Sequence, residues 1–154
     1  MLEVKFYDTV DDSLLKFAVI ISQSNGKWVF CKHKERDTYE ASGGHREIGE
    51  DILETAKREL QEETGAIQFD INPICVYSVT GKNSVNETGE ETFGLLCFAE
   101  ITEFAGKLES EIEKVELMDE LPQNWTYPLI QPKLIEKYLQ IEKQSYSQIQ
   151  LAAK

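Results

Sequence analysis

The sequence of 154 residues contains few cysteines and histidines, and neither kind is arranged for zinc. Cys31, Cys75 and Cys97 are scattered through apolar segments, and none belongs to a C-x2-C pair. His33 and His45 form neither an HExxH motif nor an H-x3-H pair. The sequence therefore argues against a Cys/His zinc centre. It predicts reduced thiols in the core, as in cytosolic proteins.

Positive charge and membrane-directed segments are also scarce. Lys and Arg number 16 against 28 Asp and Glu, which gives a formal net charge of −12. This charge opposes non-specific attraction to nucleic acid polymers and anionic membranes. No basic n-region precedes an apolar h-region, and no apolar run reaches the length of a membrane span. We expect a cytoplasmic protein that binds neither nucleic acid polymers nor membranes. Because of its negative charge, a polyphosphate ligand should arrive as a metal complex or bind to metal that the protein already holds.

The bulk composition is that of an ordinary globular domain, with 41% hydrophobic and 29% charged residues. The sequence shows no internal repeat and no low-complexity segment, so we expect one domain over residues 1–154. Its oligomeric state is left as monomer or homodimer. The tail from about residue 143 either extends a final helix or frays, and the sequence allows both.

Apolar and β-branched runs predict strands at 14–22 and 27–32, joined by a hairpin turn at Asn25-Gly26. Further strand-like segments follow, and a polar segment at 80–91 is expected to form a mobile loop. A final helix is predicted from Pro132 with one apolar face. This order of elements predicts an α/β protein with a mixed sheet between helices. The further strand-like segments are 67–69, 74–80, 92–102 and 114–118.

A helix is predicted between Asp51 and Gly65. Asp51 is a favourable N-cap, and Glu54 three residues later completes an arrangement like a capping box. Gly65 suits the left-handed residue that ends many helices. One narrow stripe of this helix is apolar and should face the core. That stripe consists of Leu53, Ala56 and Leu60.

Three carboxylates share a neighbouring stripe of the same helix, because Glu59, Glu62 and Glu63 are spaced i, i+3 and i+4. Their mutual repulsion would raise their pKa values and disfavour the helix. A hard divalent cation such as Mg²⁺ would remove this conflict, since it prefers carboxylate oxygens. Arg58 is interpreted as a guanidinium that orients these acids. A solvated acidic face is the alternative, but it does not explain the fixed spacing to the glycines.

The spacing from Gly44 to Ala66 matches the pattern G-x5-E-x7-R-E-U-x-E-E-x-G-U, where U is aliphatic. In this respect the chain resembles the Nudix hydrolases, and only Ala66 is smaller than usual. The resemblance implies the Nudix fold, an α/β/α sandwich with a central mixed β-sheet. It also implies hydrolysis of a nucleoside diphosphate linked to another moiety X, with Mg²⁺, for which Mn²⁺ may substitute. The matching positions are Gly44, Glu50, Arg58, Glu59, Leu60, Glu62, Glu63, Gly65 and Ala66.

The resemblance also implies roles for individual residues. Glu59, Glu62 and Glu63 would hold the metal together with the backbone carbonyl of Gly43. Glu50 would be either a further ligand or a partner of Arg58. The reaction would be attack of water on phosphorus, and the metal would spread the charge that develops on the phosphoryl oxygens.

A general base is also required, and the sequence offers several candidates. Glu59 lies in the motif, whereas Glu111 lies in an acidic segment where many relatives place a catalytic glutamate. We prefer Glu111, with Glu113 as the next choice there, because Glu59 is expected to be engaged with the cation. Glu90 or Glu91 in the polar loop is a further alternative.

The substrate would be a small nucleotide-like diphosphate, and aromatic residues suggest where its base binds. Tyr39, Trp125 and Tyr127 are candidates for stacking, although Trp125 could equally pin the last helix to the sheet. Arg46 could contact phosphate, as could Lys32, Lys34 and Arg36. The favoured activity is conversion of a nucleoside triphosphate to monophosphate and pyrophosphate, with oxidised purines such as 8-oxo-dGTP as candidates. Nucleotide sugars and dinucleoside polyphosphates remain alternatives.

Two other classes of function are weighed against hydrolysis. The run Ser42-Gly43-Gly44-His45 resembles the Ser-x-Gly-His pattern of isopentenyl-diphosphate isomerases, a Nudix-fold branch. That branch uses a separate catalytic Cys and a metal-binding His set, which this sequence does not offer. A non-catalytic Nudix-fold binding module typically loses a carboxylate of the motif, and here the motif is complete. Hydrolysis is therefore favoured.

Overall fold

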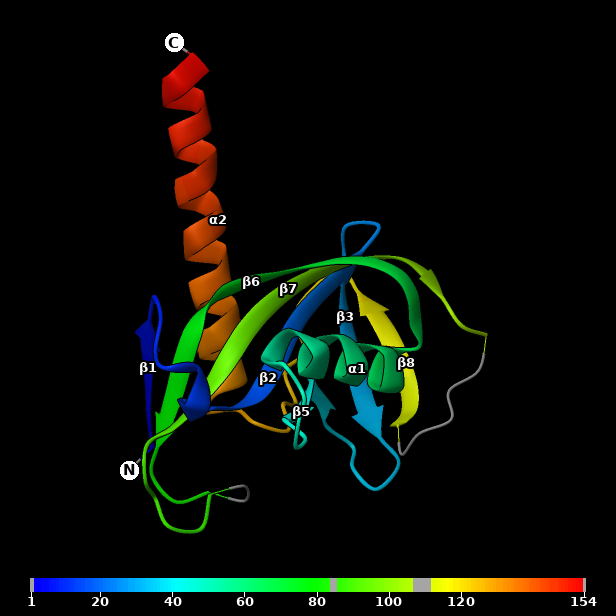
Figure 1. Ribbon diagram of the computed structural model, residues 1–154. Coiled ribbons are helices and arrows are strands. Elements are labelled where there is room, and N and C mark those ends of the chain that lie inside the picture. The colour runs from blue at the N-terminus through cyan, green and yellow to red at the C-terminus, as the bar shows by residue number, and fades with distance from the viewer. Residues whose placement is uncertain (1, 84–85, 107–111, 154) are drawn as a thin grey trace.

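The computed structural model describes residues 2–83, 86–106 and 112–153, except for the side chains of 113 and 145–153 (Figure 1). One mixed sheet lies between two helices, α1 (Ile52–Thr64) and α2 (Gln131–Ala153). Each helix packs against a different apolar cluster of the sheet. The predicted α/β/α sandwich is thus confirmed. Neither described helix combines the length and apolarity that crossing a membrane requires.

The strand order in the sheet is β1-β6-β7-β2-β3-β4, with β5 paired to β2 and β8 paired to β3. Among the described pairs β2 and β7 run parallel and the others run antiparallel, so the sheet is mixed as predicted. A short 3-10 helix, η1 (Asp12–Leu14), precedes β2. The strands are β1 (Glu3–Tyr7), β2 (Leu15–Ser24), β3 (Lys27–His33), β4 (Tyr39–Glu40), β5 (Ser42–His45), β6 (Ala66–Thr80), β7 (Thr92–Phe104) and β8 (Ile112–Met118).

Strands β2 and β3 form the predicted hairpin, but they remain paired only near its turn. Asn25 and Gly26 have φ angles of 55° and 77°, which the primed hairpin turns require. Beyond Ser22 the two strands separate, and the chain from 39 to 45 fills the space. In that space β4 pairs with β3 and β5 pairs with β2. Gly43 and Gly44 are thereby fixed within the sheet.

The core is divided between the two faces of the sheet. The cluster on the α1 side includes Ala56 and Leu60, so the predicted apolar stripe of that helix does face the core. The cluster on the α2 side includes Leu134, Ile135 and Tyr138. The Tyr138 ring stacks on Phe98 with centroids 4.5 Å apart and joins α2 to β7.

Several expected boundaries were wrong. Segments 67–69 and 74–80 belong to one strand, β6, which passes through Pro73 because a register shift between Pro73 and Cys75 accommodates the missing N–H. The stretch 35–44, for which no strand was predicted, contains β4 and the start of β5. Strand β1 was not predicted. Helix α2 continues through the tail to Ala153, which decides between extension and fraying.

The two ends of α1 differ in how well they were predicted. Gly65 has a φ of 75° and donates its N–H to the carbonyl of Gln61, so the predicted C-terminal glycine is confirmed. Asp51 occupies the N-cap position, but its side chain accepts no capping hydrogen bond. The expected capping box with Glu54 is therefore wrong. Instead the Thr55 hydroxyl donates to Glu50 at 2.7 Å, which ties the helix to the acid of the motif.

Candidate active site

Arg58 lies at the centre of the acidic cluster. Its Nε donates to Glu50 Oε2 at 2.6 Å, and its Nη2 donates to Glu50 Oε1 at 3.1 Å. Its Nη1 donates to Glu59 Oε1 at 2.8 Å and reaches Glu62 Oε2 at 3.4 Å. Nη2 also donates to the carbonyl of His45 at 3.0 Å, which ties α1 to β5. The structure thus brings Arg58 together with three of the motif acids, in the orienting arrangement that the sequence suggested.

Glu50 is the acid most strongly held as a carboxylate. Hydrogen bonds from Arg58 and Thr55 lower the pKa of Glu50 to about 2, and the Glu47 N–H adds to this effect at 3.1 Å. Both carboxylate oxygens therefore already accept hydrogen bonds. Of the two roles left open for Glu50, this geometry supports the partner of Arg58 over the metal ligand.

Glu59 lies under β5 in a much less favourable environment for charge. Burial raises the pKa of Glu59, the charges of Glu62 and Glu50 act in the same direction, and Arg58 opposes them. A Cβ at Gly44 would collide with the Glu59 carboxylate. The glycine is thus needed for the close approach of β5 to α1, rather than for an unusual φ angle.

Glu63 and Glu62 point to different environments. Glu63 is buried, and its Oε1 accepts a hydrogen bond from the Gly43 N–H at 2.7 Å. The Glu62 side chain is about half exposed, at 54%. The acidic stripe therefore runs from the strand surface to solvent, with Gly43 bound at its inner end.

Within the described part of the chain, no three acidic, Cys or His side chains are grouped so that they could hold a metal ion. Arg58 and the Gly43 N–H hold several of these oxygens instead. The donors nevertheless fit a hard cation, since carboxylate oxygens are what Mg²⁺ prefers. The burial of Glu59 beside other acids is a cost that a cation would relieve.

A cleft of about 420 Å³ is lined by Gly43 and Gly44 together with residues of the α2-side apolar cluster. Its aromatic wall contains Phe17 and Tyr77, whose ring centroids are 5.6 Å apart. Residues at the start of α2 complete it. The cleft and the acidic helix thus share the two glycines of β5. The cleft is also lined by Ala41, Tyr127, Ile130 and Gln131.

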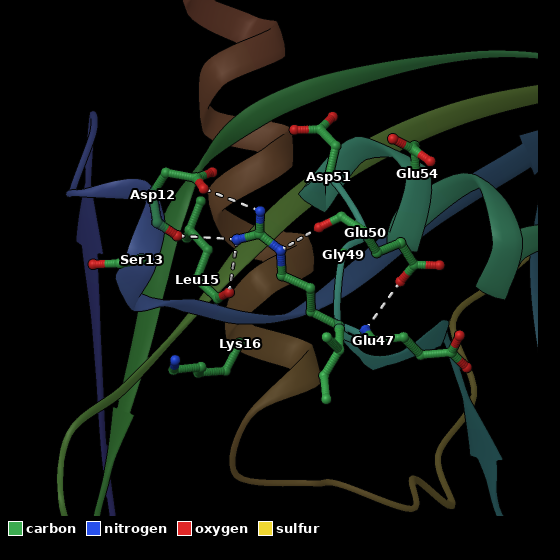
Figure 2. Close-up of a pocket in the computed structure, with 11 residues that line it drawn as sticks. Asp12, Ser13, Leu15, Lys16, Glu47, Gly49, Glu50, Asp51 and Glu54 are labelled. Atoms are coloured by element: carbon green, nitrogen blue, oxygen red, sulfur yellow. Dashed lines mark hydrogen bonds and ion pairs between the residues drawn. The ribbon is translucent and has the colours of Figure 1, made fainter.

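A second pocket, of about 640 Å³, is lined by Arg46 together with residues of η1 and of the loop before α1 (Figure 2). Arg46 Nε donates to the carbonyl of Glu50 at 2.7 Å, and Nη1 donates to the carbonyls of Asp12 and Leu15 at 3.0 and 3.3 Å. Nη2 donates to Asp12 Oδ2 at 3.0 Å. Arg46 therefore clamps η1 against the loop before α1. The contact with substrate phosphate that the sequence suggested for Arg46 stays a prediction.

The aromatic candidates are used in different ways. Trp125 packs edge-on against Phe30, with centroids 5.4 Å apart, which supports its role in pinning the α2 region to the sheet. Tyr39 lies on β4, exchanges backbone hydrogen bonds with Asn124 and Thr126, and packs into the same apolar cluster. Tyr127 lines the cleft. Phe17, Tyr77 and Gln131 were missed by sequence reasoning. Phe17 belongs to the nearly continuous apolar run at 14–22, which predicts a strand but does not indicate which residues face a cleft.

The candidate bases are only partly described. Glu111 lies outside the described residues, as does the side chain of Glu113. Glu91 accepts hydrogen bonds from Tyr7 and Ser78, both at 2.7 Å. These bonds lower the pKa of Glu91 and make it a weaker base. The geometry thus gives Glu91 a structural use at the edge of the sheet.

Comparison with known proteins decides the family. A family model described as the NUDIX domain matches residues 13–138. The chain belongs to the Nudix family. A Bacillus subtilis (strain 168) protein named "Putative 8-oxo-dGTP diphosphatase YtkD" is 32% identical over 127 residues, which cover 79% of this chain and 73% of that protein.

Solved structures agree with this assignment. A mutant form of the Bacillus subtilis pyrophosphohydrolase BsRppH is 25% identical, with a TM-score of 0.72 over 90% of each chain. A UDP-X diphosphatase is 18% identical, with a TM-score of 0.68 over 89% of this chain and 66% of that one, and it shows the fold alone. Together with the complete motif, these matches identify the protein as a Nudix hydrolase.

Proposed function

We propose that this Nudix hydrolase converts purine nucleoside triphosphates to monophosphate and pyrophosphate, and that oxidised purines such as 8-oxo-dGTP are among its substrates. The observation that carries the proposal is the shared position of Gly43 and Gly44. They line the aromatic cleft, and they contact the acids of α1. A nucleotide with its base in the cleft would extend its phosphates over the glycines to the acidic helix.

The cleft suits a nucleobase better than a second phosphate or a sugar. Phe17, Tyr77 and Ile130 make much of its wall apolar. Stacking on an aromatic side chain contributes about 1–3 kcal/mol per base. The relative named as an 8-oxo-dGTP diphosphatase supports the choice of a purine triphosphate.

Glu59, Glu62 and Glu63 would hold Mg²⁺ here, and Mn²⁺ could replace it. The bound cation would supply charge stabilisation on the phosphoryl oxygens and a lowered pKa for water. Arg58 keeps Glu59 and Glu62 in position through its hydrogen bonds. The oxygen of the attacking water bonds to phosphorus, the bond from phosphorus to the bridging oxygen breaks, and pyrophosphate leaves. We propose Glu111 as the base that takes the proton of this water.

The test is release of monophosphate and pyrophosphate from a panel of nucleotides with Mg²⁺ or Mn²⁺. The panel contains GTP, dGTP, 8-oxo-dGTP, ATP, a UDP-sugar, ADP-ribose and a dinucleoside tetraphosphate. We expect purine triphosphates to give the highest kcat/KM and pyrophosphate as product. Preference for the UDP-sugar, ADP-ribose or the dinucleoside tetraphosphate would reject the proposed substrate. Turnover that persists in Glu62→Gln and in excess chelator would reject the proposed metal site.

A further inference from the structure

Lys16 lies at an irregularity near the start of β2. In the parallel pair of β2 and β7, Leu15 pairs with Phe93 and Phe17 pairs with Gly94, so Lys16 is an extra residue in β2. Leu15 belongs to the α1-side cluster, whereas Phe17 packs against the α2-side cluster, although residues two apart in a regular strand share a face. The bulge therefore places Lys16 where the strand changes faces. Bulges next to active sites commonly redirect a side chain in this way.

This position brings Lys16 to both pockets of the protein. It lines the cleft together with Gly43 and Gly44, and it also lines the second pocket, which contains Arg46 (Figure 2). Among the described residues that line the cleft, Lys16 is the only lysine or arginine. The pairing of β2 with β5 explains its closeness to the glycines, because Ala18 pairs with Gly44. Lys16 follows two residues, about 7 Å, from this pair along β2.

The Lys16 ammonium is available for a ligand. The side chain is exposed, and its ammonium forms neither a hydrogen bond nor an ion pair with any group that the structure describes. In Figure 2 the Lys16 side chain extends away from Asp51 and Glu54. Arg46, by contrast, donates to three backbone carbonyls and to Asp12. Of these two described cations, only Lys16 keeps its donors for a ligand.

We infer that Lys16 binds a phosphate of the substrate at the place where the substrate passes from the cleft to the acidic helix. This inference rests on the proposed function, which places the base in the cleft and the phosphates over Gly43 and Gly44. The formal net charge of −12 opposes the approach of a triphosphate. A lysine ammonium is a compact point charge that suits phosphate oxygens. The cleft thus combines an aromatic wall for a base with a cation for the adjoining phosphates.

A solvated surface lysine is the competing interpretation, in which the ammonium affects the substrate only through the net charge of the protein. Lys16→Gln removes the charge, and Lys16→Arg keeps it. Lys27→Gln is the matched control, because it changes the net charge by the same amount. Lys27 lies beside the turn at the opposite end of β2, where it pairs with Asp119 at 3.8 Å. If Lys16 is only solvated, the two glutamine variants should behave alike.

The experiment measures the binding of α,β-methylene GTP and of inorganic tripolyphosphate by calorimetry in Mg²⁺, with Tm as a check on folding. In the nucleotide a methylene group replaces the bridging oxygen, so the bond cannot be cleaved during the titration. We expect Lys16→Gln to bind both ligands about three- to tenfold more weakly with an unchanged Tm. Lys16→Arg should restore most of the affinity. The loss should shrink as salt rises from about 0.05 M to about 0.5 M, because salt screens an exposed charge.

Two results would overturn the inference. If Lys27→Gln loses as much affinity as Lys16→Gln, the effect comes from net charge. If Lys16→Gln binds tripolyphosphate as the unaltered protein does, Lys16 does not contact phosphate. The proposed function can fail separately. If no nucleoside triphosphate is cleaved but Lys16→Gln binds both ligands more weakly than Lys27→Gln does, the proposed function fails and the inference stands. If triphosphates are cleaved by Lys16→Gln with unchanged KM, the inference fails and the proposed function stands.

Discussion

Gly44 lies so close to the carboxylate of Glu59 that a Cβ at this position would collide with it. This contact brings β5 and α1 together at the point where the acidic stripe begins. It explains the first glycine of the motif by the space that this glycine leaves for the carboxylate of Glu59. The same strand lines the cleft on its other side, so the position of Glu59 and the shape of the cleft depend on one another.

Gly44→Ala should leave the fold intact but displace Glu59. We expect kcat to fall by about 10²-fold or more, since a misplacement of about 1 Å in an active site has an effect of this size. Steady-state kinetics with Mg²⁺ and circular dichroism test this. Gly106→Ala is the matched control, because its Cβ would meet nothing within 4 Å. Equal losses in the two variants would contradict the steric explanation.

Arg58→Lys should cost most of the activity although it keeps the charge. Arg58 bonds Glu50 through two nitrogens and Glu59 through a third, and a lysine ammonium cannot reproduce this geometry. We expect kcat to fall by about 10- to 100-fold, with weaker Mg²⁺ binding in a titration of the free protein. Lys57→Gln changes an exposed neighbour on the same helix and should have almost no effect. If Arg58→Lys keeps its activity, the positive charge at this position is enough for activity and the hydrogen-bond geometry of Arg58 is not required.

Lowering the pH should destabilise the fold, because the Glu50 carboxylate becomes protonated and its hydrogen bonds with Arg58 weaken. Its pKa is lowered from 4.5 to about 2 by Arg58 and Thr55 in the folded state. A group with a lowered folded-state pKa contributes stability above its unfolded-state pKa, and this contribution is lost as the pH falls toward the folded-state value. Urea unfolding in chelator should therefore show stability falling between about pH 5 and pH 2.

The variant Glu50→Gln isolates this effect. It should be less stable than the unaltered protein at pH 7, and its stability should decline less steeply between pH 5 and pH 2. Glu54→Gln, which changes an exposed acid in the first turn of α1, serves as the control and should follow the unaltered protein. If the stability of Glu50→Gln falls between pH 5 and pH 2 as steeply as that of the control, the pH dependence of stability arises from other carboxylates.

The features that the sequence predicted correctly depend on residues that lie close together in the chain. Gly65 and the apolar stripe of α1 follow from preferences within one helix, and the Asn25-Gly26 turn follows from two residues. Strands β4 and β5 are too short to show a periodic pattern, and they exist because β2 and β3 separate. Phe17, Tyr77 and Gln131 come from three distant segments. Their meeting depends on strand order, which residue spacing does not reveal.

The acidic cluster shows the same division. The spacing of Glu59, Glu62 and Glu63 placed them on one stripe, but it did not show that Glu63 is buried against Gly43 while Glu62 is exposed. Arg46 shows the same limit. Its hydrogen bonds to backbone carbonyls and to Asp12 could not be read from residue spacing, and its contact with substrate phosphate stays a prediction.

The base can be identified by comparing Glu111→Gln with Glu59→Gln. Glu59 is partly buried beside other acids, and a cation would offset the raised pKa of its carboxyl. A carboxylate engaged with a cation is a poor base, whereas a glutamate from another segment keeps its basicity for the attacking water. Glu111→Gln should therefore lower kcat by about 10²-fold or more with nearly unchanged Mg²⁺ affinity. Glu59→Gln should first weaken Mg²⁺ binding, measured by titration of the free protein.

The control for this comparison is Glu120→Gln, an exposed acid later in the same region of the chain, which should alter neither quantity. The pH profile of kcat/KM gives a second readout, because loss of the base should remove its acidic limb in Glu111→Gln and leave it in Glu59→Gln. The reverse pattern would place the base on α1. If both variants lose metal affinity alike, both residues bind the cation, and Glu90 becomes the next candidate because Tyr7 and Ser78 already hold Glu91.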